Sequence, residues 1–228
     1  MKQFLQPEVW RNTIANPAAL AGLLVDLAPI VGVVFWQWSA ATLVLLYWIE
    51  KLIIGAVTIG RIALASVGNK GPIAIPGVAF TCTFFVFHYG IFWLAHGGLV
   101  LEFFGGGSSW PASMDLLKAG SAMLATALQF GDNMVWVVAI MAVWHVAQFA
   151  SYVREGGWKG ADPNIEMLRP YGRVVALHIA VFSAGAALSA TGNPAIGLVL
   201  LVIARAAFGV VISQRTRSKA PLTEAVAT

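Results

Sequence analysis

The chain has 228 residues, of which 59% are hydrophobic and 11% are charged. A mean hydropathy of +0.79, with far fewer charged residues than the roughly one quarter found in soluble proteins, excludes an ordinary soluble domain. The formal net charge of +4 is explained by membrane topology and does not indicate a nucleic-acid partner. We therefore expect one all-α integral membrane domain over residues 1–228, surrounded by the lipid bilayer.

The predicted elements are apolar runs of spanning length, since a helix that crosses a bilayer needs about 20 apolar residues. Asn16 and Pro17 fit an N-cap followed by the first helical position, and they start the first span. Glycine and proline break the apolar pattern at residues 69–77, between the second and third spans, and they also separate the last two spans at residues 192–194. The six predicted transmembrane helices cover about 17–37, 39–64, 76–101, 133–153, 170–191 and 194–213.

A seventh helix is predicted over residues 114–130, after the glycine-rich connection 105–111. Leucine, methionine and alanine recur on one face of this segment, opposite Lys118, Ser121 and Gln129. An amphipathic helix of this kind lies in the membrane interface. The polar segment 154–170 is the long hydrophilic loop of the prediction, and it is the candidate docking site for a protein partner.

The positions of lysine and arginine set the expected orientation, because cytoplasmic loops collect these residues. In a six-span arrangement, one side carries Lys118 together with Glu102, Asp115 and Asp132. The remaining basic residues considered fall on the other side: Lys2, Arg11, Arg61, Lys70, Arg154, Lys159, Arg169, Arg173, Arg215, Arg217 and Lys219. We therefore expect both termini to be cytoplasmic, in the inner membrane of a bacterium.

All four histidines of the chain fall within predicted spans. At about 1.5 Å per residue, Glu50, His88, His145 and His178 lie between about 12 and 18 Å from the cytoplasmic ends of their helices. Four helices can therefore direct these side chains toward one volume in the middle of the membrane. His96 lies eight residues beyond His88, about 12 Å further along the helix and rotated by roughly 80°, so we expect it to make a separate polar contact near the outer surface.

Imidazole nitrogens and a carboxylate are suitable ligands for a transition metal, and a bound cation offsets the cost of burying Glu50. The predicted metal ligands are His88, His145, His178 and Glu50, for zinc, iron, copper or manganese. A b-type haem held by two of the three histidines is the weaker alternative, because the step from His88 to His96 does not fit a pair of stacked haems. The competing structural interpretation is that each histidine makes a hydrogen bond between helices.

Other buried charges have a simpler interpretation. Asp26, Lys51 and Arg205 lie inside predicted spans, where ion pairing between them is the expected arrangement. Glu50 is open to either role, as a metal ligand or as a partner of Arg205. Arg61 is expected to extend toward the interface. The lone Cys82 provides neither a disulfide nor a cysteine metal site.

Three blocks of sequence carry a resemblance to a known family: YWIEKLIIG at 47–55, FFVFHYGIFWLAHG at 84–97 and RPYGRVVALHIAVFSAG at 169–185. They resemble bacterial multi-pass membrane proteins known only as a domain of unknown function. Lys51 departs from the pattern, since an uncharged amide is expected there. The resemblance implies a compact helical membrane protein without naming a reaction, and it maps its pattern onto Tyr47, Trp48, Glu50, His88, Tyr89, Gly90, His96, Gly97, Tyr171, Gly172, Arg173 and His178.

The sequence leaves three functions open. The first is a membrane protein with a buried His/Glu site for a transition metal or haem, engaged in redox chemistry or metal handling. The second is a noncatalytic accessory or scaffold subunit, either docked to a partner through loop 154–170 or assembled as a homo-oligomer. The third is a small proton-coupled transporter, although no inverted repeat is detectable. Whether the protein is an enzyme is left open.

Overall fold

The computed structural model describes residues 34–104 and 115–191, together with residues 20, 29, 31 and 32. Every regular element within this part of the chain is helical. The α-helices are α3 (Ala40–Lys70), α4 (Ile75–Phe104), α5 (Leu116–Leu128), α6 (Met134–Arg154), α7 (Pro163–Leu168) and α8 (Tyr171–Thr191), and the short 3-10 helix η2 (Gly71–Ala74) joins α3 to α4.

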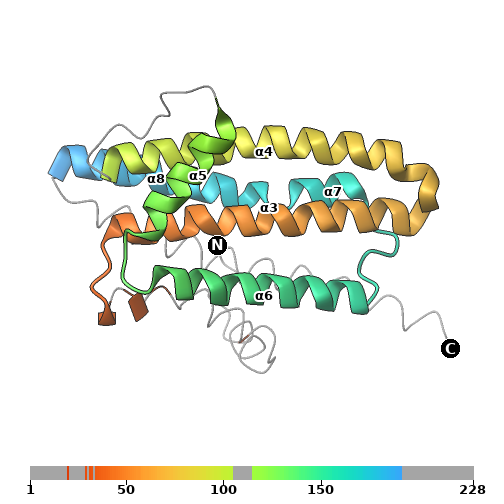
Figure 1. Cartoon of the computed structure of the whole chain (residues 1–228), viewed down its shortest axis with the longest axis horizontal. Helices are drawn as coiled ribbons and strands as arrows, with labels where there is room; N and C mark the ends of the chain where they lie inside the picture. The colour runs from red at the N-terminus through yellow and green to blue at the C-terminus, as the bar shows by residue number, and fades with distance from the viewer. Residues whose placement is uncertain (1–19, 21–28, 30, 33, 105–114, 192–228) are drawn as a thin grey trace, which may run out of the picture.

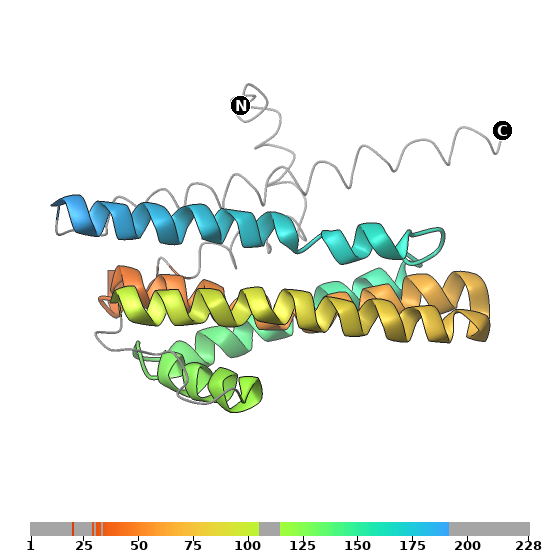
Figure 2. The same cartoon turned by 90° about the horizontal axis from the view of Figure 1, so that it is seen from above.

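Helix α3 is the centre of the bundle and contacts α4, α5, α6, α7 and α8. Figure 1 shows α3, α4 and α6 lying nearly parallel, with α5 crossing the end of the hairpin at an angle. Viewed from above, α7 and α8 follow one another on one side of the α3–α4 hairpin, and α5 lies on the other side (Figure 2). This position explains why residues 41–51 of α3 are all buried.

Local signals define both ends of α3. The hydroxyl of Ser39 accepts a hydrogen bond from the Thr42 amide and caps the first turn. Gly71 ends the helix with φ at +68°, a backbone conformation that glycine adopts without steric cost. The helix runs to Lys70, six residues beyond the predicted end at 64, and the side chain of Asn69 in this last part bonds the Trp158 carbonyl.

Two tryptophans lock α3 to α4. The rings of Trp48 and Trp93 stack with centroids 4.3 Å apart, and each indole N–H donates to the backbone carbonyl of the other residue, at 2.6 and 3.0 Å. Gly97 permits this close approach, because a Cβ at that position would collide with the Trp48 indole. The contact holds the hairpin together without any titratable group.

The other described helices agree with the predicted segments within about three residues at each end. Predicted segments 76–101, 114–130, 133–153 and 170–191 correspond to α4, α5, α6 and α8, respectively. Predicted loop 154–170 contains the additional helix α7. The predicted span 17–37 lies largely outside the described residues, and the predicted span 194–213 lies wholly outside them.

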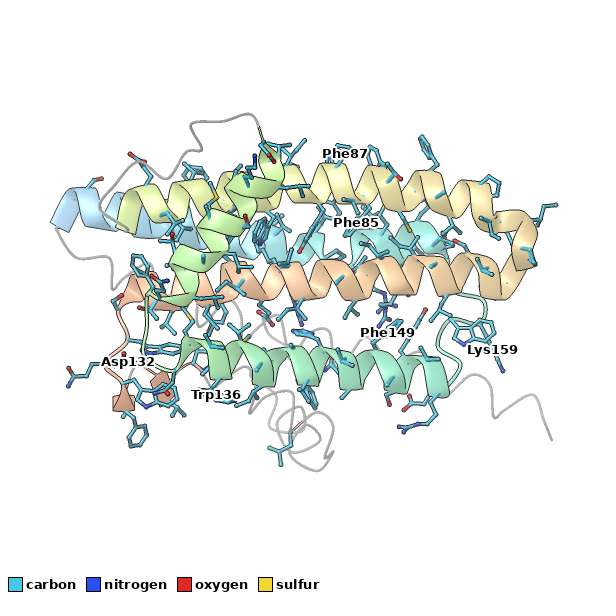
Figure 3. All side chains as sticks on the ribbon, in the orientation of Figure 1. Phe85, Phe87, Asp132, Trp136, Phe149 and Lys159 are labelled. Atoms are coloured by element: carbon cyan, nitrogen blue, oxygen red, sulfur yellow. The ribbon has the colours of Figure 1, made fainter. Side chains whose placement is uncertain are left out.

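Two described segments are long and apolar enough to cross a membrane, namely Ala41–Glu102 and Met134–Arg154. The first contains the chain reversal at η2, so it comprises most of the α3–α4 hairpin. Large apolar side chains also point outward from these helices. Figure 3 shows Phe85 directed toward α3 while Phe87 lies on the opposite side of α4, and the exposed fractions of Phe87 and Trp136 are 64% and 70%.

Candidate functional site: two interhelical histidine pairs

The first buried pair joins α3 to α6. Nε2 of His145 lies 2.9 Å from Oε1 of Glu50, and both residues are buried. His145 belongs to a buried stripe of α6 formed by residues 134, 137, 141 and 145, a spacing that keeps one helix face directed toward α3. A guanidinium nitrogen of Arg173 on α8 lies 3.8 Å from the same carboxylate oxygen. Glu50 therefore connects three helices.

The second pair joins α4 to α8. Nε2 of His96 lies 2.6 Å from Nδ1 of His178, and Nδ1 of His96 lies 2.5 Å from the Phe92 carbonyl oxygen. Because a carbonyl oxygen only accepts hydrogen bonds, Nδ1 of His96 carries a proton. In neutral His96 the other nitrogen then holds a lone pair, so Nδ1–H of His178 is the donor. The lone pair of His96 is consequently used within the protein.

His88 lies apart from both pairs in its printed contacts. It is exposed on α4, and its ring stacks on Phe84 and meets the edge of Phe92. The ring centroid of Tyr171, at the start of α8, is 5.8 Å away. His88 thus belongs to an aromatic group on the helix surface, whereas the prediction directed it toward the interior.

Lys51 is buried beside Glu50 on α3, with 4% of its surface exposed. Its side-chain nitrogen has no hydrogen-bond partner among the described residues. The hydroxyl of Tyr89 on α4 donates to the Lys51 backbone carbonyl at 3.0 Å. This bond ties α4 to the α3 backbone at Lys51.

The structure brings together only part of the predicted ligand set. Glu50 and His145 are in contact, His178 pairs with His96, and His88 stacks on aromatic rings. Within the described residues, no group of three or more histidine, cysteine, aspartate or glutamate side chains is placed to hold a metal ion. His96, predicted to make a separate polar contact near the outer surface, is 2% exposed and bonded to His178, a member of the predicted ligand set, while its depth in the membrane stays a prediction.

The position of α7 explains why His178 contacts His96 and does not join the other predicted ligands. The prediction measured the depth of His178 from the start of its span, as if all helices began at one level. In Figure 2, α7 lies beside the end of the hairpin nearest η2, and α8 begins only further along. Tyr171 at the start of α8 is therefore next to His88, and His178, two turns later, is next to His96.

A separate ionic group attaches α7 to α3. Glu166 is 2% exposed and receives Arg61 at 2.7 Å and Arg169 at 3.0 Å. The guanidinium of Arg61 also lies 3.7 Å from the ring centroid of Tyr152 at the end of α6. The prediction that Arg61 extends toward the interface stays untested, and its guanidinium forms a salt bridge with Glu166 in loop 154–170. The sequence shows an acidic residue, Glu166, in loop 154–170. Its partner could not be identified from the sequence, because it depends on how the loop folds back against α3.

Comparison with known proteins identifies a family and no function. No curated protein and no solved structure is detectably similar to the chain. A family of unknown function, DUF6498, matches residues 8–225, which include both histidine pairs and nearly the whole sequence. The chain therefore belongs to the DUF6498 family.

Proposed function

We propose that the protein is a multi-pass protein of a bacterial inner membrane, with six spans and both termini in the cytoplasm. Support comes from the two described segments of membrane-crossing length and hydropathy, and from the apolar side chains that face outward. On α4, Phe80, Phe84, Phe87 and Ile91 follow one another at helical spacing, and all four are exposed. Such a stripe is suited to contact with lipid chains.

We propose further that the protein is a small proton-coupled transporter. The observation that carries this proposal is the presence of two separate titratable pairs, Glu50–His145 and His96–His178, at contacts between helices. Ionisable residues inside membrane helices are costly and commonly mark ion or proton pathways. A change in the protonation of either pair changes the bond that holds one helix to another.

The two pairs connect α6 and α8 to the α3–α4 hairpin, which is itself held together by other contacts. Since Trp48 and Trp93 hold α3 to α4 without titratable groups, protonation leaves the hairpin intact. The same event alters the contact of α3 with α6 or that of α4 with α8. A proton is thereby coupled to a rearrangement of helices, which is the step that a transporter needs.

Each pair has a defined capacity for protons. The His96–His178 pair holds one proton between two ring nitrogens, and the Phe92 carbonyl cannot pass on the second proton of His96. This pair therefore stores and returns a proton, and it does not act as a continuous wire. In the other pair, one proton bridges Nε2 of His145 and Oε1 of Glu50, and Arg173 places a positive charge 3.8 Å from the same oxygen.

Vesicles containing the purified protein and an internal pH dye test the proposal. Potassium and valinomycin hold the membrane potential at zero while amino acids, sugars, monocarboxylates, inorganic anions and metal cations are added one at a time. At least one solute is expected to change the internal pH only when the protein is present. Glu50→Gln, which keeps the acceptor for His145 but cannot ionise, should abolish the change.

His88→Phe is the matched control, because His88 lies on the exposed face of α4 and outside both pairs. It should transport at the wild-type rate. The proposal fails if no solute produces a pH change beyond that of empty vesicles, or if Glu50→Gln behaves like the wild type.

A transition-metal site is a second proposal, favoured by the contact between Glu50 and His145, two of the four predicted ligands. Elemental analysis and a visible spectrum of protein purified without a histidine tag test for metal and for haem. A stoichiometric metal that decreases in His145→Ala supports this function. Protein without metal and without a Soret band contradicts it. The accessory or scaffold role of loop 154–170 stays a prediction.

A further inference from the structure

Helix α7 directs its carboxylate toward the bundle and its large aliphatic side chains away from it. Glu166 is 2% exposed and bonded to Arg61 of α3, whereas Ile165 and Leu168 are 58% and 59% exposed. A helix that lies between a protein core and water shows the reverse pattern, with apolar side chains inside and charged ones outside. The outer face of α7 is therefore suited to apolar surroundings.

Aliphatic side chains are also exposed at the adjacent tip of the α3–α4 hairpin. Ile73 in η2 and Ile75 at the start of α4 are 86% and 56% exposed. Figure 2 shows α7 beside this end of the hairpin. We refer to the four exposed aliphatic residues Ile73, Ile75, Ile165 and Leu168 as the tip surface.

Exposed basic residues lie around the tip surface. Arg169 directly follows α7 with 52% of its side chain exposed, and Lys70 is the last residue of α3. Lys159 is held near this end of α3, because the neighbouring Gly160 N–H donates to the side chain of Asn69 at 2.9 Å. Among the residues that the structure describes, the exposed charges at this end are four basic and two acidic: Lys70, Arg154, Lys159 and Arg169 against Glu155 and Asp162.

The other end of the bundle has the opposite charge. Exposed carboxylates lie there at Glu102, near the end of α4, and at Asp132, just before α6, while Lys118 on α5 is paired with Asp115. Figure 3 labels Asp132 and Lys159 at the two ends. The described part of the chain therefore attracts an anionic surface at the end that carries the tip surface.

The length of α3 places the tip surface at the level of lipid headgroups in the membrane arrangement proposed above. At about 1.5 Å per residue, the 31 residues of α3 extend over about 46 Å, whereas the hydrocarbon core of a bilayer is about 30 Å thick. The ends of α3 therefore reach beyond the hydrocarbon. Aliphatic side chains beside exposed lysine and arginine are the combination that binds anionic lipid at this level.

We propose that the tip surface and the basic residues around it bind anionic phospholipid of the cytoplasmic leaflet. Ile165 and Leu168 contact the acyl chains. Arg169, Lys70 and Lys159 bind the phosphate oxygens of the headgroups. This inference rests on the proposed membrane placement, and it assigns a lipid partner to the loop that was expected to dock a protein.

The charge and the apolar area occur together, which favours a lipid over the other occupants. A free phosphate would engage the basic residues and leave Ile165 and Leu168 exposed to water. A separate protein is not needed to cover the surface, because phospholipid already surrounds a membrane protein at headgroup level. A phospholipid with one negative charge satisfies both parts of the surface.

Native mass spectrometry of the full-length protein in detergent provides the test. The protein is titrated with phosphatidylglycerol and with phosphatidylcholine of the same acyl chains, and the two dissociation constants are compared. The wild type should prefer phosphatidylglycerol by about tenfold or more. Glycerol 3-phosphate, the headgroup chemistry without chains, should not displace the bound lipid.

Substitutions locate the bound lipid. Lys70→Gln, Lys159→Gln and Arg169→Gln should each lower the preference for phosphatidylglycerol by up to about fivefold, and the triple variant should bind the two lipids equally. Lys118→Gln, at an exposed lysine of α5, is the matched control and should keep the wild-type preference. Elution profiles and melting temperatures check the folding of each variant.

A fluorescent label at Leu168 detects the lipid directly. Leu168→Cys is made in a Cys82→Ser background, labelled, and reconstituted with phospholipid that carries a nitroxide on its acyl chain. Nitroxide-labelled phosphatidylglycerol should quench this label more strongly than nitroxide-labelled phosphatidylcholine at the same mole fraction. A label at Trp136→Cys, an exposed position near the other end of the bundle, should be quenched equally by both lipids.

The inference is overturned if the wild type binds the two lipids equally, if the triple variant keeps the preference, or if glycerol 3-phosphate displaces the lipid. Equal binding would return the tip surface to the protein partner predicted for loop 154–170. The failures of the two proposals are distinguishable. Equal binding of both lipids leaves the membrane placement intact, whereas a protein that stays monodisperse without detergent and binds neither lipid contradicts the placement itself.

Discussion

The α3–α4 hairpin and the contacts of α6 and α8 with it are stabilised by different chemistry. Within the hairpin, Trp48 and Trp93 stack and exchange indole hydrogen bonds with backbone carbonyls. Across the contacts of the hairpin with α6 and α8, the corresponding bonds join Glu50 to His145 and His96 to His178. The difference separates a hairpin held by uncharged indole and backbone groups from two neighbouring helices that are attached to it through ionisable side chains.

The largest expected effect comes from removing the carboxylate of the first pair. Glu50→Leu leaves His145 buried without its acceptor and Arg173 without its counter-charge, and should lower the free energy of unfolding by about 3–5 kcal/mol. Thermal unfolding in detergent measures the loss. Glu102→Leu, at an exposed carboxylate of α4, is the control. Equal melting temperatures for the two variants would contradict a structural role for the α3–α6 pair.

Substitutions at two glycines of α4 test the tryptophan contact that holds the α3–α4 hairpin together. A Cβ at Gly97 collides with the Trp48 indole, whereas a Cβ at Gly90 of the same helix meets nothing within 4 Å. Gly97→Ala should therefore destabilise the protein by about 1–3 kcal/mol at every pH. Gly90→Ala should be neutral or slightly stabilising, since alanine favours helix. If both variants melt at the wild-type temperature, the tryptophan contact does not hold the hairpin.

The third prediction concerns the attachment of α7 to α3. Arg61 is 18% exposed at its ion pair with Glu166, while Arg169 is 52% exposed. Arg61→Gln leaves a buried carboxylate with one weaker partner and should cost about 1–3 kcal/mol. Arg169→Gln should cost less than about 1 kcal/mol, because its pair is screened by solvent. Chemical unfolding of both variants measures the two losses of stability. A larger loss for Arg169→Gln would show that solvent exposure does not determine the relative strength of these two ion pairs.

The smallest expected effect is at the start of α5, where the ionisable side chain of Asp115 caps the first turn. The amide and side chain of Lys118 hold the pKa of Asp115 below its usual range, so the cap contributes stability above that range and loses it as the pH falls toward the lowered pKa. The protection factor of the Lys118 amide, the ratio of its intrinsic to its observed exchange rate at the same pH, should therefore fall in acid. Asp115→Asn keeps a cap without a charge and should remove this acid dependence. A Lys118 protection factor that still falls in acid in this variant would contradict the assignment.

Helix boundaries were largely predictable because their causes are local. Gly71 ends α3 and Asp115 caps α5, and both residues are visible in the sequence. The direction of His145 toward α3 could not be predicted, because apolar residues occupy both the buried and the exposed sides of α6. The partner of His178 was not predictable either, because it depends on where α8 begins relative to α4, and a six-residue helix in a polar loop decides that offset.

The sequence by itself determined that the described chain is helical, that two of its segments are apolar over spanning lengths, and that its histidines lie within helices, because composition, periodicity and capping act over a few residues. Only the tertiary structure decided that Glu50 joins His145, that His96 joins His178 and that His88 faces outward. Such pairings depend on the sliding and rotation of one helix against another. Those displacements arise from packing between residues far apart in the chain.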